Sequence, residues 1–196
     1  MKKQTLVVSA VLGGLFVWAA GPLVSQEEAG DPMEMWMKAN EMGEHHQHLA
    51  DSVGNWDVAG RFWSAPGEPP TETKGSSTIQ LLHGGRYVKD EFSSEWMGVP
   101  FTGTAITGYD NVKQKYVSIW FDSMSTGFMI AEGTCLDGGR RVEMIGEYQD
   151  PMTGGAKKTR MVIRVDGPDK KSEEMFETGA DGKEVKTMEL IYTRGK

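Results

Sequence analysis

This chain of 196 residues has one cysteine and fewer basic than acidic residues, and each of these features excludes a class of protein. The single cysteine, Cys135, excludes an internal disulfide, so the folded protein must be stabilised by packing. Lysine and arginine number 21 against 28 acidic residues, and the net charge of −7 argues against a nucleic-acid partner. The longest apolar run is shorter than the roughly 20 residues that a membrane-spanning helix needs.

That apolar run covers residues 6–20, follows two lysines and is followed by Gly21 and Pro22. A basic start, a short apolar run and small residues behind it are typical of a secretory signal peptide. We therefore predict a signal peptide over residues 1–25 and a linker over 26–31, with an uncleaved anchor as the alternative. Without the two lysines the chain keeps 19 basic and 28 acidic residues, a net charge of −9. We expect an exported protein, periplasmic or secreted, with no stable membrane insertion after cleavage.

Residues 32–53 are predicted to form an N-terminal helical segment. Asp31 suits the N-cap position and Pro32 the first position of a helix. One stripe of this helix then carries Met33, Trp36, Met37 and Asn40. After Gly43 a second short helical piece contains three histidines. The pattern favours a methionine-rich helix that covers one end of a barrel.

Beyond Gly54 the apolar period changes to two, which is the period of a strand. Runs rich in β-branched and aromatic residues alternate with turn clusters of Gly, Pro and Asp. We predict ten strands near 55–64, 75–83, 86–96, 100–109, 115–122, 127–135, 141–148, 158–166, 172–178 and 185–194. No run of helical period separates them, so crossover connections are excluded and the sheet should be antiparallel throughout.

The strands should close into a barrel. In 158–166 the residues Thr159 and Met161 alternate with charged neighbours, and the run 142–148 alternates in the same way. One-sided alternation with hairpin-length links favours an up-and-down barrel, because closure removes the edge strands that a sandwich would have to protect. We therefore predict an all-β domain, an antiparallel barrel of about ten strands over residues 54–196.

The residues around Gly54-Asn55-Trp56 resemble the G-x-W signature of the lipocalin and calycin barrels. Arg194 stands where that group places a basic side chain over the tryptophan. Four stretches, EHHQHLADSVGNWDV, GYDN…YVSIWFDSMSTG, EYQDPMTGG and DGKEVKTMELIYTR, are similar to the bacterial domain-of-unknown-function family 1579 over residues 44–194. The resemblance implies a calycin-like barrel, often exported and without an established activity, in which Gly54, Trp56 and Arg194 have structural roles.

The histidines predict neither a haem nor a dedicated metal site. A more distant resemblance is to the haem-binding nitrobindin group, whose proximal histidine lies late in the chain, whereas the last histidine here is His83. On a helix His45 and His48 are neighbours, but His46 points about 100° away, so one ion would gain only two imidazoles. Cys135 has no activating base nearby in the sequence and is interpreted as a small core residue. We expect no cofactor.

The corner that ends the strand 115–122 is the candidate functional rim. Trp120 and Asp122 share a face of that strand, so a carboxylate lies beside an aromatic wall if the face points into the barrel. The predicted ligand-binding residues are His46, Trp96, Trp120, Asp122, Ser123, Met129 and Met144. No catalytic residue is assigned.

Three functions are compatible with these residues. The first is a binding module that holds a small apolar or amphipathic ligand in the barrel. The second is an enzyme for a small substrate, in which His46 and Asp122 form a base and its orienter. The third is a structural or protein-interaction domain of the cell envelope, which a packed interior and an exposed Met/Trp helix would favour. The sequence carries no indication of the oligomeric state.

Overall fold

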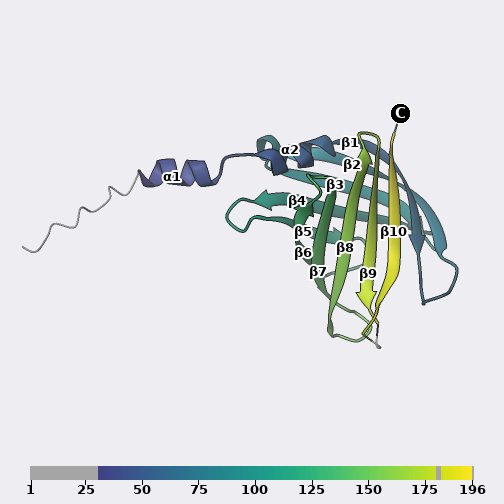
Figure 1. Cartoon of the computed structure of the whole chain (residues 1–196). Helices are drawn as coiled ribbons and strands as arrows, with labels where there is room; N and C mark the ends of the chain where they lie inside the picture. The colour runs from purple at the N-terminus through teal and green to yellow at the C-terminus, as the bar shows by residue number, and fades with distance from the viewer. Residues whose placement is uncertain (1–30, 180–181, 196) are drawn as a thin grey trace, which may run out of the picture.

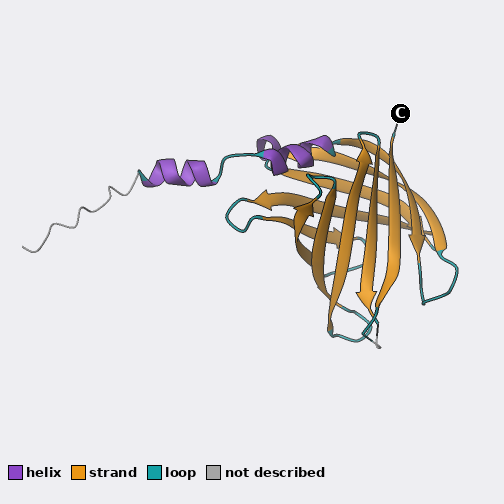
Figure 2. Cartoon of the chain, in the orientation of Figure 1, coloured by secondary structure: helices purple, strands orange, loops and turns teal. Residues whose placement is uncertain are grey.

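The computed structural model describes residues 31–179 and 182–195, so the predicted signal peptide lies outside the described residues. Ten strands form one closed antiparallel barrel in the order β1-β10-β9-β8-β7-β6-β5-β4-β3-β2 (Figures 1 and 2). They are β1 (Gly54–Phe62), β2 (Thr71–Leu82), β3 (Tyr87–Trp96), β4 (Val99–Asp110), β5 (Lys115–Asp122), β6 (Met129–Leu136), β7 (Arg141–Gln149), β8 (Ala156–Gly167), β9 (Lys170–Thr178) and β10 (Glu184–Arg194). The predicted all-β up-and-down barrel is confirmed.

The largest difference from the predicted strands is at β2, which begins at Thr71 instead of 75. The ladder between β1 and β2 continues to the pair Phe62 and Thr71. The four additional residues, 71–74, are polar and lack the apolar alternation on which the prediction rested. Their backbone groups are nevertheless paired by the neighbouring strand, which is the condition that defines a strand.

Two short helices precede the barrel, α1 (Pro32–Ala39) and α2 (Glu44–Asp51). The side chain of Asp31 accepts a hydrogen bond from the backbone N–H of Met33, as an N-cap does. Helix α1 stands away from the barrel and buries none of its residues, whereas α2 lies across one barrel end (Figure 1). The barrel end is therefore covered by α2 and not by the methionine-rich α1, whose Trp36 is 64% exposed. None of the helices in the described ranges is long and apolar enough to cross a membrane.

Helix α2 is held to the barrel by Trp56 and Arg194, which are paired across β1 and β10. The guanidinium carbon of Arg194 lies 4.3 Å from the Trp56 ring centre. Arg194 donates to the carbonyls of Val53 at 2.8 Å and Asp51 at 3.3 Å, and the Trp56 indole donates to that of Ser52 at 2.9 Å. The last carbonyls of a helix have no partner within it, so these donors cap α2. We call this end of the barrel the helix end and the opposite one the far end.

Gly54 provides the space that Arg194 occupies. Its φ angle is +139°, a conformation that side chains disfavour, and a Cβ atom there would lie 2.5 Å from Nη1 of Arg194. The glycine of the G-x-W motif is therefore required both by the backbone and by the arginine that closes the barrel.

Candidate functional site

The barrel interior near the helix end contains five polar residues, which we call the interior polar cluster: Ser77, Asp90, Lys171, Glu173 and Tyr192. They come from β2, β3, β9 and β10. Lys171 is paired with Tyr192, and Glu173 with Leu190, and both of these partners are buried core residues. Paired residues in a sheet point to the same face, so Lys171 and Glu173 point into the barrel.

Only some of the polar groups in this cluster have a hydrogen-bonding or charged partner among the described residues of the protein. The Ser77 hydroxyl donates to Oδ1 of Asp90 at 2.5 Å. The Lys171 ammonium lies 4.4 Å from the Tyr192 ring centre and 5.1 Å from that of Trp56, within the range of a cation–π interaction. Within the part of the chain that the structure describes, however, neither the Lys171 ammonium nor the Glu173 carboxylate forms a hydrogen bond or a close ion pair, although Asp90 and Glu173 attract Lys171 electrostatically.

Lys171 and Glu173 are the two charged residues of the cluster without a hydrogen-bonding partner in the described ranges, and their burial is incomplete. Both side chains are partly buried rather than completely enclosed. Among the described residues, only Nε of Arg141 is a fully buried side-chain nitrogen or oxygen without a partner. The charged atoms of Lys171 and Glu173 are therefore not completely enclosed by the protein.

Enclosure by the barrel shifts the titration of the cluster toward its neutral forms. Burial raises the pKa of Glu173 to about 7, an effect that Lys171 opposes and Asp90 reinforces. Burial also raises the pKa of Asp90, against the hydrogen bond from Ser77, and lowers the pKa of Lys171. The pKa of Tyr192 is raised well above 10 for the same reason. Glu173 can consequently gain or lose a proton near neutral pH.

Aromatic and methionine side chains form the walls beyond the polar cluster. The ring centres of Phe92, Phe101 and Trp120 lie 6.1 to 6.5 Å from one another. Met144 is buried, and Met129 packs against the core. Toward the far end, Trp96 meets the ring of Phe62 edge-on at 4.6 Å. The list of interior residues predicted from the sequence thus includes four that do line the barrel: Trp96, Trp120, Met129 and Met144.

Asp122 lies at the far end, where it orients Trp120. One carboxylate oxygen accepts from the Trp120 indole at 3.1 Å, and the other accepts from the backbone N–H of Met124 at 2.9 Å. Ser123 is exposed, and its hydroxyl accepts from the backbone N–H of Thr102 at 3.1 Å. Asp122 therefore holds an aromatic wall in place, whereas Ser123 extends the ladder between β4 and β5 and does not face the interior.

His46 is buried at the helix end, where its Nδ1 accepts from the backbone N–H of Gly43 at 3.1 Å and caps α2. Its ring also meets Tyr109, which is paired with Tyr116 at the start of β5. Asp122 lies six residues farther along the same strand, a distance of about 20 Å at the rise of a β-strand. His46 and Asp122 therefore do not form the base-orienter pair that the enzyme hypothesis requires.

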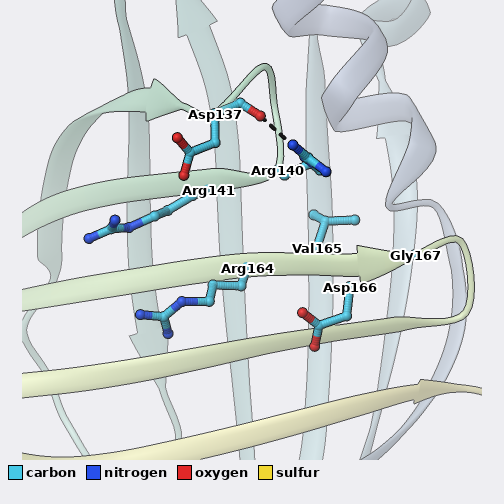
Figure 3. A pocket seen from close by; sticks show the side chains of 7 residues that line it. All are labelled: Asp137, Arg140, Arg141, Arg164, Val165, Asp166 and Gly167. Atoms are coloured by element: carbon cyan, nitrogen blue, oxygen red, sulfur yellow. Dashed lines mark hydrogen bonds between the residues drawn. The ribbon is translucent and has the colours of Figure 1, made fainter.

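A separate hollow of about 760 Å³ lies on the outer face of β7 and β8 (Figure 3). Its lining residues are Asp137, Arg140, Arg141, Arg164, Val165, Asp166 and Gly167. Arg141 forms an ion pair with Glu143, and Arg164 with Glu174. Two of the three arginines that line the hollow therefore already have acidic partners within the protein.

The sequence contains a signal for the interior polar cluster that the prediction did not use. In 86–96, Asp90 stands between Val88 and Phe92 on the apolar face of a strand. Lys171 and Glu173 share a face with Met175 in the same way, but the predicted strand began at residue 172. A charge on an apolar strand face is the pattern that marks such a site.

Comparison with known proteins identifies a family but no activity. No curated protein matches the chain. The crystal structure of Rv2717c from M. tuberculosis has a TM-score of 0.61 at 14% identity, over 80% of this chain and all of that one, which shows the fold alone. A redesigned β-barrel (15% identity, 80% and 99% covered, TM-score 0.41) and a DUF3598 protein from Nostoc punctiforme (8%, 79% and 100%, TM-score 0.24) are too distant to support an argument. A family model described as protein of unknown function, DUF1579, matches residues 41–194, so the chain belongs to the DUF1579 family.

Proposed function

We propose that the protein is an exported binding protein that holds a small amphipathic molecule inside its barrel. The observation that carries the proposal is the pair Lys171 and Glu173, whose charged groups point into the barrel without a side-chain hydrogen bond or close ion pair to the described residues. A charged group removed from bulk water is costly unless it is paired. A ligand whose polar end has both donors and acceptors would provide partners for both side chains.

The arrangement of the walls supports one orientation for this ligand. Helix α2 covers the helix end, so the ligand would enter from the far end with its polar group first. Its apolar part would then lie against Phe92, Phe101 and Trp120, and Asp122 would keep the Trp120 ring in position. Aromatic walls with a few polar groups at one end are typical of small-molecule sites.

The two other functions have weaker support. The enzyme hypothesis lacks its orienter, because His46 on α2 lies near the start of β5, whereas Asp122 is at the end of that strand. An interaction domain is favoured by the exposed side chains of α1, of which Met33 and Trp36 are 62% and 64% exposed. That surface does not explain the charges inside the barrel, whereas a bound amphipathic molecule does.

The test uses 8-anilinonaphthalene-1-sulfonate, an aromatic anion whose fluorescence rises in apolar surroundings, with the purified full chain. We expect binding of one probe per chain. Lys171→Met keeps the length of the side chain and removes its charge, and it should weaken binding by about 10-fold, the value of one charge-assisted hydrogen bond. Lys158→Met, a change on the exposed outer face of β8, is the matched control and should bind like the wild type.

Near-ultraviolet circular dichroism establishes that each variant keeps its tertiary packing. Equal affinity of folded Lys171→Met and of the wild type would refute the proposed role of the interior polar cluster. A folded wild type that binds no probe would contradict the proposed amphipathic binding site in the barrel. Native mass spectrometry of freshly purified protein adds a direct measurement of any retained small molecule.

A further inference from the structure

Three side chains with metal-binding atoms meet at the helix end, away from the interior polar cluster. His45 and His48 lie one turn apart on α2, and Cys135 comes from β6. One ligand atom from each of them lies within 4.8 Å of the other two. The thiol thus supplies the third ligand that the sequence around the histidines lacks.

The hydroxyl group of Tyr116 shows where the two imidazoles point. Nδ1 of His45 lies 3.1 Å from this oxygen, and Nδ1 of His48 lies 3.3 Å from it. The His45 ring is stacked on Tyr109 with 3.9 Å between the ring centres, which fixes its orientation. Both Nδ1 atoms are therefore directed toward one point between α2 and the barrel.

Neighbours of His48 have the features of an outer coordination shell. Its second nitrogen, Nε2, lies 3.6 Å from a carboxylate oxygen of Glu44, one turn earlier on α2. A carboxylate behind a ligating histidine fixes the ring and increases its basicity in many metal sites. On the other side the ring lies against Gly139, where a Cβ atom would be 2.4 Å from it. A glycine at that turn is therefore needed for His48 to occupy its position.

Two imidazoles and a thiolate are a donor set that suits zinc. Zinc binds histidine nitrogen at about 2.0–2.1 Å and cysteine sulfur at about 2.3 Å, so the ligand atoms of a tetrahedral site are about 3.3–3.8 Å apart. The spread of 4.8 Å is wider than this by about 1 Å, a difference that small side-chain rotations can close. In the described structure the Cys135 thiol has only a weak hydrogen bond of 3.7 Å to the carbonyl of Leu136, and it also interacts with the Tyr116 hydroxyl, toward which both imidazoles point.

We infer that His45, His48 and Cys135 form a zinc site that joins α2 to β6, with the fourth position open to water or to the Tyr116 oxygen. The inference is independent of the proposed ligand in the barrel, because none of the three side chains belongs to the interior polar cluster. A three-ligand site with one free position is the arrangement found in catalytic zinc centres, whereas structural sites have four protein ligands.

The test is a titration of the purified full chain, reduced and freed of metal, with Co²⁺ and then with Zn²⁺. We expect one cobalt ion per chain, a thiolate-to-cobalt charge-transfer band, and loss of this band when Zn²⁺ displaces the cobalt. Cys135→Ser should abolish the band. It should also weaken zinc binding by at least about 100-fold, since changes in an outer shell alone cost 10–100-fold.

The matched control is His83→Gln, which removes the exposed histidine of the 83–85 turn and should leave the band and the zinc affinity unchanged. Thermal unfolding is the second measurement. Zinc should raise the melting temperature of the wild type and of His83→Gln but not that of Cys135→Ser or His48→Gln. A folded wild type without the charge-transfer band, or equal zinc affinity in Cys135→Ser, would overturn the inference.

Discussion

The contact between Trp56 and Arg194 predicts an energetic coupling between the first and the last strand. Arg194 stacks on the indole and donates to three backbone carbonyls, those of Asp51, Val53 and Pro168. Arg194→Lys keeps the charge but loses the planar stack and the forked donor geometry. Trp56→Leu removes the aromatic face and the indole N–H while it keeps an apolar side chain in the core.

The magnitudes follow from these contacts. Trp56 is 3% exposed, and replacing it with alanine should cost about 3–5 kcal/mol of the free energy of unfolding, so leucine should cost about 2–3 kcal/mol. Arg194→Lys should cost about 1–2 kcal/mol, because a cation–π contact and some of the charged hydrogen bonds are lost. The two changes should be non-additive, with a coupling of about 0.5–2 kcal/mol.

Urea unfolding of the wild type, both single variants and the double variant measures the coupling, with both tryptophan fluorescence and circular dichroism as signals. Arg61→Lys is the matched control, since Arg61 lies on the same strand pair and its ion pairs with Glu72 and Glu189 are on the outer surface. It should change stability by less than about 1 kcal/mol. A coupling indistinguishable from zero would mean that the stack does not join the two ends of the sheet.

Two further changes test the interior and the G-x-W motif. Because the pKa of Glu173 is raised from 4.5 to about 7 by burial, the stability that its proton provides is complete below pH 4.5 and is lost as the pH rises through 7. As the pH rises over this range, Glu173→Gln should therefore gain about 1–3 kcal/mol of stability relative to the wild type. Glu147→Gln, a change on the outer surface, is the control and should show no such gain. Equal pH profiles of Glu173→Gln and the wild type in urea unfolding would contradict the enclosure of Glu173. Gly54→Ala should lower the free energy of unfolding by more than the 1–3 kcal/mol of a strained backbone alone, because its Cβ displaces Arg194. Gly67→Ala is the control, because Gly67 also has a positive φ angle but no atom lies near the position of its Cβ. Equal losses of stability for Gly54→Ala and Gly67→Ala in thermal unfolding would show that Arg194 does not require the space at Gly54.

The sequence by itself determined the strands and their order, because apolar alternation and turn residues are local properties. The period of two after Gly54 and the hairpin-length links were enough for ten antiparallel strands in a closed barrel. The motif Gly54-Asn55-Trp56 and Arg194 also indicated which strands meet, through the resemblance to a family. These features depend on neighbouring residues or on a known pattern, and both can be read along the chain.

The tertiary structure alone decided which polar side chains share a site. Asp90 and Lys171 lie 81 positions apart in the sequence and face the same interior only because the sheet closes. Cys135 reaches His45 and His48 because α2 folds over the end of the barrel, a contact that no local pattern encodes. His46, by contrast, caps α2 and is far from Asp122. Long-range register and closure bring side chains together, and neither property is present in the spacing of residues along one strand.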